Sequence, residues 1–256
     1  MLKTHALTFG YSPERLLFKD FDLTIENGET WAILGPSGCG KTSLLYLMAG
    51  LKFPTGGEIL IDGQPLRRPR PRSGLILQDY GLLPWASVRE NVELGIRVRD
   101  FYGPDGKHTP RNYQPNRGKS DSWIERLGLK EIADKFPSQI SGGQRQRTAI
   151  ARTLLLEPDL LLMDEPFSSL DAITREDLQT LTLNLCAEQN ITLVMVTHAI
   201  EEAAAMGRKI LLLQPSLNLR AHVFENPKAG EKGYRESEEY RQLCNRLREE
   251  MQHEAA

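Results

Sequence analysis

Short apolar runs alternate with amphipathic stretches along much of this chain. The runs 31–34 and 160–163 are continuously apolar, and Ile191–Val196 is rich in β-branched residues, which is typical of buried parallel strands. Helical patterns follow the first run at 43–51 and precede the second at 141–157. Because strands that alternate with helices build a parallel sheet, the pattern predicts an α/β fold.

The first thirty residues follow a different pattern, in which short β segments are separated by turn residues. Turn signals at Ser12–Pro13 and Asn27–Gly28 divide residues 2–31,. Further short strands are predicted at Gly56–Gly63, which includes its turn, and at Leu75–Gln78. The alternating pattern is therefore preceded and interrupted by additional β structure.

Three polar stretches lie outside these elements. The arginine-rich segment 67–72 is interpreted as a solvated turn,. Residues 100–122 are rich in Gly, Pro, Asn and charge and are predicted to form a loop, either a plain connection or a docking site for a partner,. The tail from Pro227 is highly charged, with a thin apolar stripe at helical spacing that predicts a helix packed on its own domain. The stripe consists of Tyr240, Leu243, Leu247 and Met251.

Composition limits the location and the partners of the protein. A length of 256 residues suits one large domain, and a net charge of -2 gives no strong field toward nucleic acid,. No stretch approaches the roughly 18–20 apolar residues of a membrane span, and the N-terminus lacks the apolar core of a signal peptide. The three cysteines have no paired spacing, so we expect reduced thiols,. We expect a cytoplasmic protein that serves a membrane only as a peripheral subunit.

A glycine-rich loop connects the first apolar run to the first helix. Gly35–Thr42 fits the pattern G-x-x-x-x-G-K-[ST] at every fixed position,. Its glycines let successive N–H groups point toward a phosphate, and the following helix N-terminus adds donors. Lys41 supplies a charge for the β- and γ-phosphates, and Thr42 supplies a hydroxyl for Mg²⁺. The loop predicts a site for MgATP, with Cys39 interpreted as a small packing residue. The residues assigned to it are Gly35, Pro36, Ser37, Gly38, Cys39, Gly40, Lys41, Thr42 and Ser43.

The second apolar run ends in two carboxylates, Asp164 and Glu165. Ligands of parallel α/β sheets bind at the carboxyl ends of the strands. Asp164 at the tip of the strand can hold the Mg²⁺ shell. Glu165, one residue further, can orient or deprotonate the attacking water. The pair predicts hydrolysis of the bound nucleotide.

Residues 140–147, with the sequence ISGGQRQR, resemble the LSGGQ signature of the nucleotide-binding subunits of ABC transporters, with Ile in place of the first Leu. Ser169–Asp171 resembles the D-loop of that family, and Thr197–His198 resembles its switch histidine. The resemblance covers the chain from about residue 3 to 225. It implies an α/β fold with a P-loop NTPase core and a mostly parallel sheet, an antiparallel β subdomain and a helical signature subdomain.

The same resemblance implies a division of the chain. The ATPase domain spans 1–226, and its helical subdomain spans about 85–157. The polar residues 100–122 form a loop insertion in that subdomain. Residues 227–256 form the charged helical tail.

The resemblance also assigns roles by position. Tyr11 corresponds to the aromatic residue that stacks on adenine, and Gln78 to the residue that senses Mg²⁺ and the attacking water. Glu165 corresponds to the general base, and His198 to the γ-phosphate sensor. Without the resemblance, Tyr11 and His198 read as ordinary structural residues.

A second anion site is predicted at Ser141, because this residue begins a helix and its hydroxyl lies beside free helix N–H groups. In the family this segment contacts the γ-phosphate of an ATP held by another copy, which implies a homodimer that sandwiches two ATP molecules. The residues assigned to this half of the site are Ser141, Gly142, Gly143 and Gln144, with Asp171 in the D-loop.

Residues 78–92, with the sequence QDYGLLPWASVRENV, are similar to the ATPases of nitrate, sulfonate and taurine importers, a type that thiamine-precursor importers share. The similarity implies a transmembrane permease and, indirectly, a solute-binding protein as partners, at the inner face of the cell membrane. Leu83 and Trp85 are candidate anchors for the permease, although Trp85 is equally compatible with the core. The alternative is a non-transport ABC ATPase, which the single cassette and the lack of heptads and cysteine pairs disfavour. A catalytically silent nucleotide sensor is disfavoured because the candidate base and switch histidine are both present.

Overall fold

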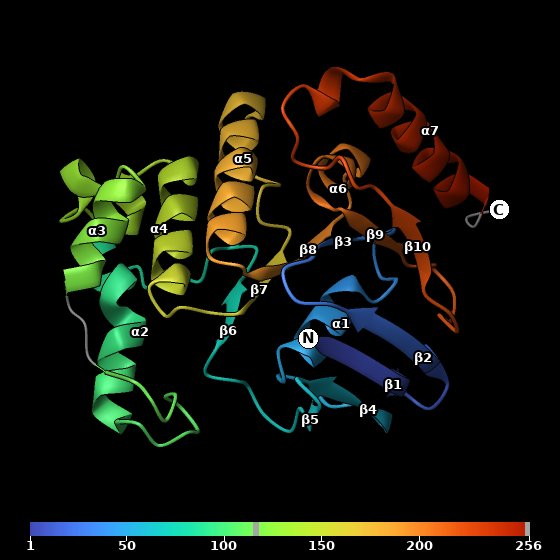
Figure 1. Cartoon of the computed structure of the whole chain (residues 1–256), viewed down its shortest axis with the longest axis horizontal. Helices are drawn as coiled ribbons and strands as arrows, with labels where there is room; N and C mark the ends of the chain where they lie inside the picture. Colours follow the sequence, from blue (N-terminus) through green and yellow to red (C-terminus); the bar gives the residue numbers. More distant parts are fainter. Residues whose placement is uncertain (115–117, 254–256) are drawn as a thin grey trace. The chain divides into compact units, whose positions relative to one another are not determined.

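The computed structural model describes residues 1–114 and 118–253 (Figure 1). The chain forms two compact units, one made of Met1–Pro69 and Cys186–Ala256 and the other of Arg70–Leu185. Both units combine strands with helices, so the predicted α/β class is confirmed. Among the described residues, no helix is both long enough and apolar enough to cross a membrane.

The first unit contains an antiparallel sheet with the strand order β2-β1-β4-β5. The strands are β1 (Leu2–Ser12), β2 (Arg15–Ile25), β4 (Gly56–Ile61) and β5 (Gln64–Pro65). The turn predicted at Ser12–Pro13 joins β1 to β2. Inward-facing residues of these two strands, among them Leu7, Phe18 and Phe21, are fully buried. This sheet agrees with the antiparallel subdomain that the family resemblance implied.

The same unit contains a second run of strands in the order β10-β9-β3-β8. Their bounds are β3 (Thr30–Leu34), β8 (Thr192–Thr197), β9 (Lys209–Leu212) and β10 (His222–Glu225). Strand β3 is parallel to both of its neighbours, and only the edge strand β10 is antiparallel within this run. Every residue of β8 is buried, which explains why this strand reads as a nearly continuous apolar run.

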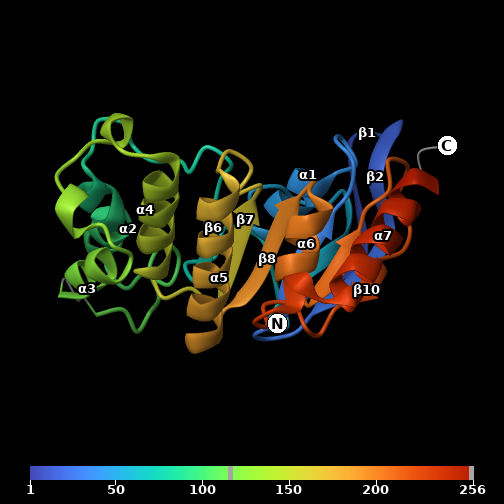
Figure 2. The same ribbon diagram turned by 90° about the horizontal axis from the view of Figure 1, so that it is seen from above.

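Helices α1 (Lys41–Met48), α6 (Ile200–Met206) and α7 (Glu238–His253), with the short 3₁₀ turn η3 (Tyr234–Glu236), complete the first unit. Figures 1 and 2 show α7 beside α6. Leu247 of α7 is fully buried, and the Tyr240 hydroxyl donates to the carbonyl of Glu201 at 3.0 Å. The charged tail therefore folds as a helix on its own unit, as its apolar stripe predicted.

The second unit contains one parallel strand pair and a group of helices. Its strands are β6 (Ser73–Ile76) and β7 (Leu160–Asp164), which pair with Ile76 opposite Met163. The predicted strand 75–78 thus lies two residues earlier. Helices α2, α3 and α4 pack together, as Figure 2 shows. The helix bounds are α2 (Val88–Tyr102), α3 (Gly118–Arg126), η1 (Lys130–Ile132), η2 (Pro137–Gln139), α4 (Gly142–Leu154) and α5 (Ala172–Glu188).

The loop predicted over 100–122 is wrong at both ends. Helix α2 continues to Tyr102, and α3 begins at Gly118. Helix α2 extends because Arg99, although charged, is buried in its last turn, and Gly103 ends the helix with a φ of 64°. Residues 103–114 form the observed connection, and residues 115–117 of the predicted loop lie outside the described part of the chain.

Candidate functional site

The glycine-rich loop spans the gap between the end of β3 and the start of α1. Gly38 and Gly40 have φ angles of 83° and 107°, which side chains with a Cβ rarely adopt. At Gly35, an added Cβ would come within 2.6 Å of the Leu213 carbonyl oxygen. These glycines let the backbone curl tightly at the N-terminus of α1, where helix N–H groups face the loop and the helix dipole favours an anion.

Lys41 is buried at the base of this loop. Its ammonium donates to the carbonyls of Gly35 at 2.8 Å and Pro36 at 2.9 Å. The side chain therefore folds back over the loop and holds its charge inside the cradle. Cys39 is also buried, and burial raises the pKa of its thiol. Its protonated thiol is consistent with a packing residue.

Tyr11 lies beside the start of α1 and is 62% exposed. Its hydroxyl hydrogen-bonds the Ser43 hydroxyl at 2.8 Å, and Phe9 meets its ring edge-on at 5.6 Å. The ammonium of Lys52 lies 4.9 Å from the centroid of the ring. An exposed aromatic ring held next to a phosphate loop can stack on a base. Sequence reasoning missed Lys52, which no motif marks.

His198 follows the last residue of β8 and is exposed. The parallel register pairs Leu34 with Thr197. His198 and the phosphate loop therefore both follow the carboxyl ends of their strands, at the same edge of the sheet. The Thr197 hydroxyl donates to the Glu202 carboxylate at 2.7 Å and accepts from the Ala199 N–H at 3.0 Å. These bonds fix the turn that carries His198.

In the second unit, Gln78 and Glu165 meet across a long stretch of sequence. The amide of Gln78 donates to the Glu165 carboxylate at 3.4 Å, because each residue lies two positions beyond the paired residues Ile76 and Met163. Glu165 has a φ of 44°, an unusual angle for a residue with a side chain,. Asp164 is buried at the end of β7. The structure thus places the predicted base within hydrogen-bond distance of the amide that was predicted to sense Mg²⁺ and the attacking water.

Ser141 caps the N-terminus of α4 in a reciprocal arrangement with Gln144. The Ser141 hydroxyl accepts from the Gln144 N–H at 3.2 Å, and the Gln144 side chain accepts from the Ser141 N–H at 3.0 Å. At Gly143, an added Cβ would come within 2.6 Å of a methyl of Thr174. The signature therefore forms a rigid helix start, and its Gln144 side chain has a structural partner that sequence reasoning did not foresee.

Asp171 lies just before α5, where its carboxylate accepts from the Thr174 N–H at 3.0 Å. This hydrogen bond lowers the pKa of Asp171, so the group is ionised at neutral pH. Tyr80, which follows Gln78 by two residues, shares a 2.7 Å hydrogen bond with Ser169. That contact ties the segment after β6 to the predicted D-loop.

Arg152 is a second residue that the sequence analysis did not assign. From the last turns of α4, its guanidinium donates to the carbonyls of Tyr80 and Gly81, each at 2.6 Å. The residue therefore holds the segment after Gln78 against the signature helix. In the sequence, Arg152 is one of several arginines in a basic helix, so no sequence pattern singled out this residue.

Replacing Arg152 with Met should lower the free energy of unfolding by about 2–3 kcal/mol, because two carbonyls lose a charged donor. Urea denaturation measures the change. The matched control is Arg97→Met, at an exposed arginine of α2 that pairs with Glu93, where the loss should stay below about 1 kcal/mol. Equal losses in the two variants would contradict the assigned role.

The predicted site residues thus form two groups. Tyr11, the phosphate loop and His198 lie in the first unit, and the Gln78–Glu165 pair, Asp164, the signature and Asp171 lie in the second. The cradle of the first group fits nucleotide phosphates, since its glycines adopt angles that bring N–H groups together,. Thr42 in the first unit and Asp164 in the second each carry an oxygen of a kind that Mg²⁺ prefers, a hydroxyl and a carboxylate,.

Residues 18–168 match the protein family described as ABC transporter. The nitrate import ATP-binding protein NrtC of Synechococcus elongatus is 41% identical over 77% of this chain and 29% of its own length. NrtD of the same organism is 40% identical over 76% of this chain and 68% of its length. The aliphatic sulfonates import ATP-binding protein SsuB of Bacillus anthracis is 34% identical over 93% of this chain and 89% of its length. The chain therefore spans less than a third of NrtC.

Solved structures of ATP-binding proteins are also similar to this chain. The ATP-binding cassette MJ0796, a dimer in a post-hydrolysis state bound to ADP and Pi, has a TM-score of 0.71 and 32% identity, and the match covers 87% of this chain and 98% of that one. The cbiO1 component of a Clostridium perfringens ABC transporter complex has a TM-score of 0.74 and 27% identity, and the match covers 98% of this chain and 97% of that one.

Proposed function

Because the chain belongs to the ABC transporter family of ATP-binding proteins, we propose that it is the ATP-hydrolysing motor subunit of a transporter. The pairing of Glu165 with Gln78 is the observation that carries the proposal. A phosphate loop alone binds nucleotide, whereas a carboxylate and an amide beyond the ends of the paired strands β7 and β6 supply the groups that hydrolysis requires,.

The residues divide the chemistry as follows. The phosphate loop holds the phosphates, and Lys41 supplies a positive charge to the β- and γ-phosphates. Thr42 and Asp164 supply oxygen ligands for Mg²⁺, which when bound neutralises charge that develops on the phosphates.

Glu165 accepts a proton from the attacking water, and Gln78 orients that water. His198 contacts the γ-phosphate, and Tyr11 stacks on the adenine ring.

The complete site requires two copies of the chain. Ser141 begins α4 in the second unit with its own helix N-terminus, and one ATP has no need of two such anion sites within one chain. A head-to-tail dimer, in which the signature of one copy meets the nucleotide held by the other, uses both. The dimeric structure of MJ0796 bound to ADP and Pi supports the formation of a dimer. Binding of ATP then favours the closed dimer, and hydrolysis favours the open one.

The dimer drives import of a small solute, such as nitrate, a sulfonate or a thiamine precursor, through a separate permease at the inner face of the membrane. The names of the nitrate and sulfonate import relatives support this choice. Trp85 is 74% exposed, which rules out the core as its place and suits an anchor for the permease. Solute specificity then belongs to the permease and to a solute-binding protein.

Mixing two inactive variants tests the dimer. In Lys41→Ala the phosphate loop is defective, and in Ser141→Arg the signature is blocked, so each homodimer has no complete site. Random mixing gives half mixed dimers, each with one intact site, so about a quarter of the wild-type ATPase rate should return. Phosphate release measures the rate. A mixture as inactive as its two components would contradict the head-to-tail arrangement.

A further inference from the structure

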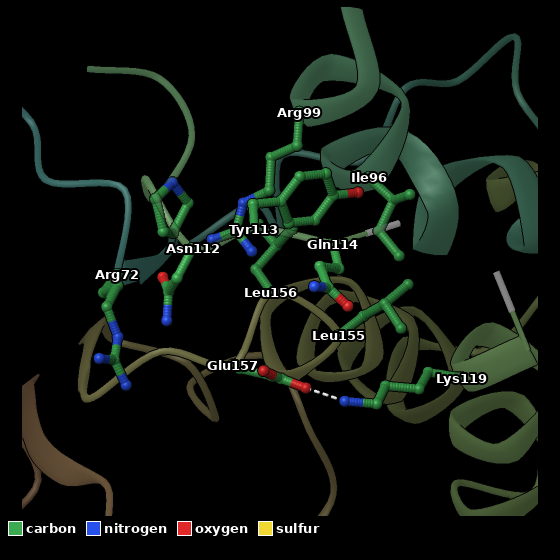
Figure 3. A pocket seen from close by; sticks show the side chains of 11 residues that line it. Arg72, Ile96, Arg99, Asn112, Tyr113, Gln114, Lys119, Leu155, Leu156 and Glu157 are labelled. Atoms are coloured by element: carbon green, nitrogen blue, oxygen red, sulfur yellow. Dashed lines mark hydrogen bonds and ion pairs between the residues drawn. The ribbon is translucent and has the colours of Figure 1, made fainter. Parts of the chain in front are cut away.

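The observed connection after α2 encloses a cavity that the proposed function does not use. The cavity has a volume of about 390 Å³ and lies within the second unit, between the end of α2, residues 110–114 and the end of α4. Figure 3 shows Arg99 and Tyr113 on one side of it and the ion pair of Lys119 and Glu157 on the other. Ile96 and Leu156 supply apolar lining.

Arg99 is the unusual residue of this cavity, because its side chain is charged and the residue is only 6% exposed. Its guanidinium donates to the Pro71 carbonyl at 2.6 Å and lies 5.7 Å from the centroid of the Tyr113 ring. No carboxylate lies within ion-pairing distance of Arg99 in the described part of the chain. A guanidinium has five N–H donors, and a buried charge without a counter-ion is costly.

The charges around Arg99 leave the cavity positive. Arg72, Arg99 and Lys119 line it, against one lining carboxylate, Glu157, which pairs with Lys119. Arg72 pairs with Asp159 at 3.4 Å, so Arg99 is the one of these three cations that has no carboxylate partner among the described residues. Burial lowers the pKa of Arg99, Tyr113 and Glu157 oppose this shift only in part, and the charge of Arg72 adds a smaller lowering. The exposed side chains of Arg72 and Lys119 can turn toward a ligand, because each keeps about half of its surface in solvent.

We propose that this cavity binds a small organic anion, with a carboxylate or phosphate head that pairs with Arg99 and a short apolar body that packs on Tyr113 and Ile96. The anion supplies the counter-ion that Arg99 lacks, and Arg72 and Lys119 close over the head. The site lies at the C-terminal end of α4, the helix whose first turn carries the signature. It does not depend on the proposed ATPase function.

Isothermal titration calorimetry of the full chain tests the site with three probes of similar shape. Benzoate and phenyl phosphate carry the two candidate heads, and neutral benzamide carries neither. All titrations contain saturating MgADP, so that phenyl phosphate does not report on the phosphate loop. We expect saturable binding of at least one anion and none of benzamide. The better-bound anion identifies the head group.

Variants locate the binding. Arg99→Gln should weaken it about tenfold or more, because a buried charged pair is lost. Arg72→Gln and Lys119→Gln, at exposed positions that tolerate substitution, should weaken it about threefold, and Glu157→Gln should strengthen it by a similar factor, since Lys119 is then released. Arg97→Gln, two residues from Arg99 but outside the cavity, should change nothing. Absence of saturable binding, or binding that these cavity variants leave unchanged, would overturn the proposal.

Discussion

Replacing Glu165 with Gln is expected to lower the rate of ATP hydrolysis by about 10²–10⁴-fold. The amide keeps the shape of the side chain and can still hydrogen-bond Gln78, which lies 3.4 Å away, but it cannot accept the proton of the attacking water. Phosphate release under saturating MgATP measures the loss.

The same variant should still bind ATP, because the phosphate loop belongs to a different unit and is untouched. With hydrolysis blocked, the closed dimer should accumulate and elute as a dimer in size-exclusion chromatography with MgATP. Glu131→Gln, at an exposed carboxylate of η1 in the same unit, is the matched control and should behave as wild type. A Glu165→Gln protein that hydrolyses ATP at the wild-type rate would show that the base is another residue.

Replacing Lys41 with Ala is expected to weaken ATP binding by about 10–100-fold, since the charged hydrogen bonds of a buried ammonium are worth about 1.5–3 kcal/mol. The loss should fall mainly on the triphosphate, so AMP should bind about equally to variant and wild type. Fluorescence titration with a labelled ATP, together with AMP competition, separates the two effects.

The fold should survive this substitution, because the lost hydrogen bonds run to the carbonyls of Gly35 and Pro36 within the same loop. Circular dichroism checks that point. Lys19→Ala, at an exposed lysine of β2 in the same unit, is the matched control for a lost positive charge. ATP binding that is equally strong in Lys41→Ala and wild type would refute the assignment of the phosphate loop.

The strands and the phosphate loop were predictable because their signals are local. The run from Trp31 to Leu34 is buried throughout β3, and the glycines that follow have positive φ angles. The helix predicted from residue 43 begins two residues earlier, at Lys41, because Gly40 already ends the loop in the left-handed region. Errors at such boundaries are small, since backbone angles and helix caps are decided by neighbouring residues.

Residues 100–122 were predicted as one loop because their composition is polar. The structure of this stretch depends on tertiary contacts, which composition does not show. Arg99 looks like a surface residue in the sequence, yet it is buried in the last turn of α2 and its ring partner Tyr113 follows the helix. Trp85 shows the opposite case: an apolar residue that composition could not place is largely exposed. Burial at both positions depends on which residues pack against them in the fold. A local sequence pattern does not contain that information.

The sequence by itself determined the family, and it predicted the chemistry of each motif, because a glycine loop, a capped helix start and a strand that ends in carboxylates are all encoded within a few consecutive residues. Only the tertiary structure decided which motifs meet. Gln78 reaches Glu165 because β6 and β7 pair in a parallel register. Arg152 holds the segment after Gln78 through carbonyls some seventy residues away in the chain. Such contacts depend on strand register and on the packing of whole helices, so no local sequence pattern predicts them.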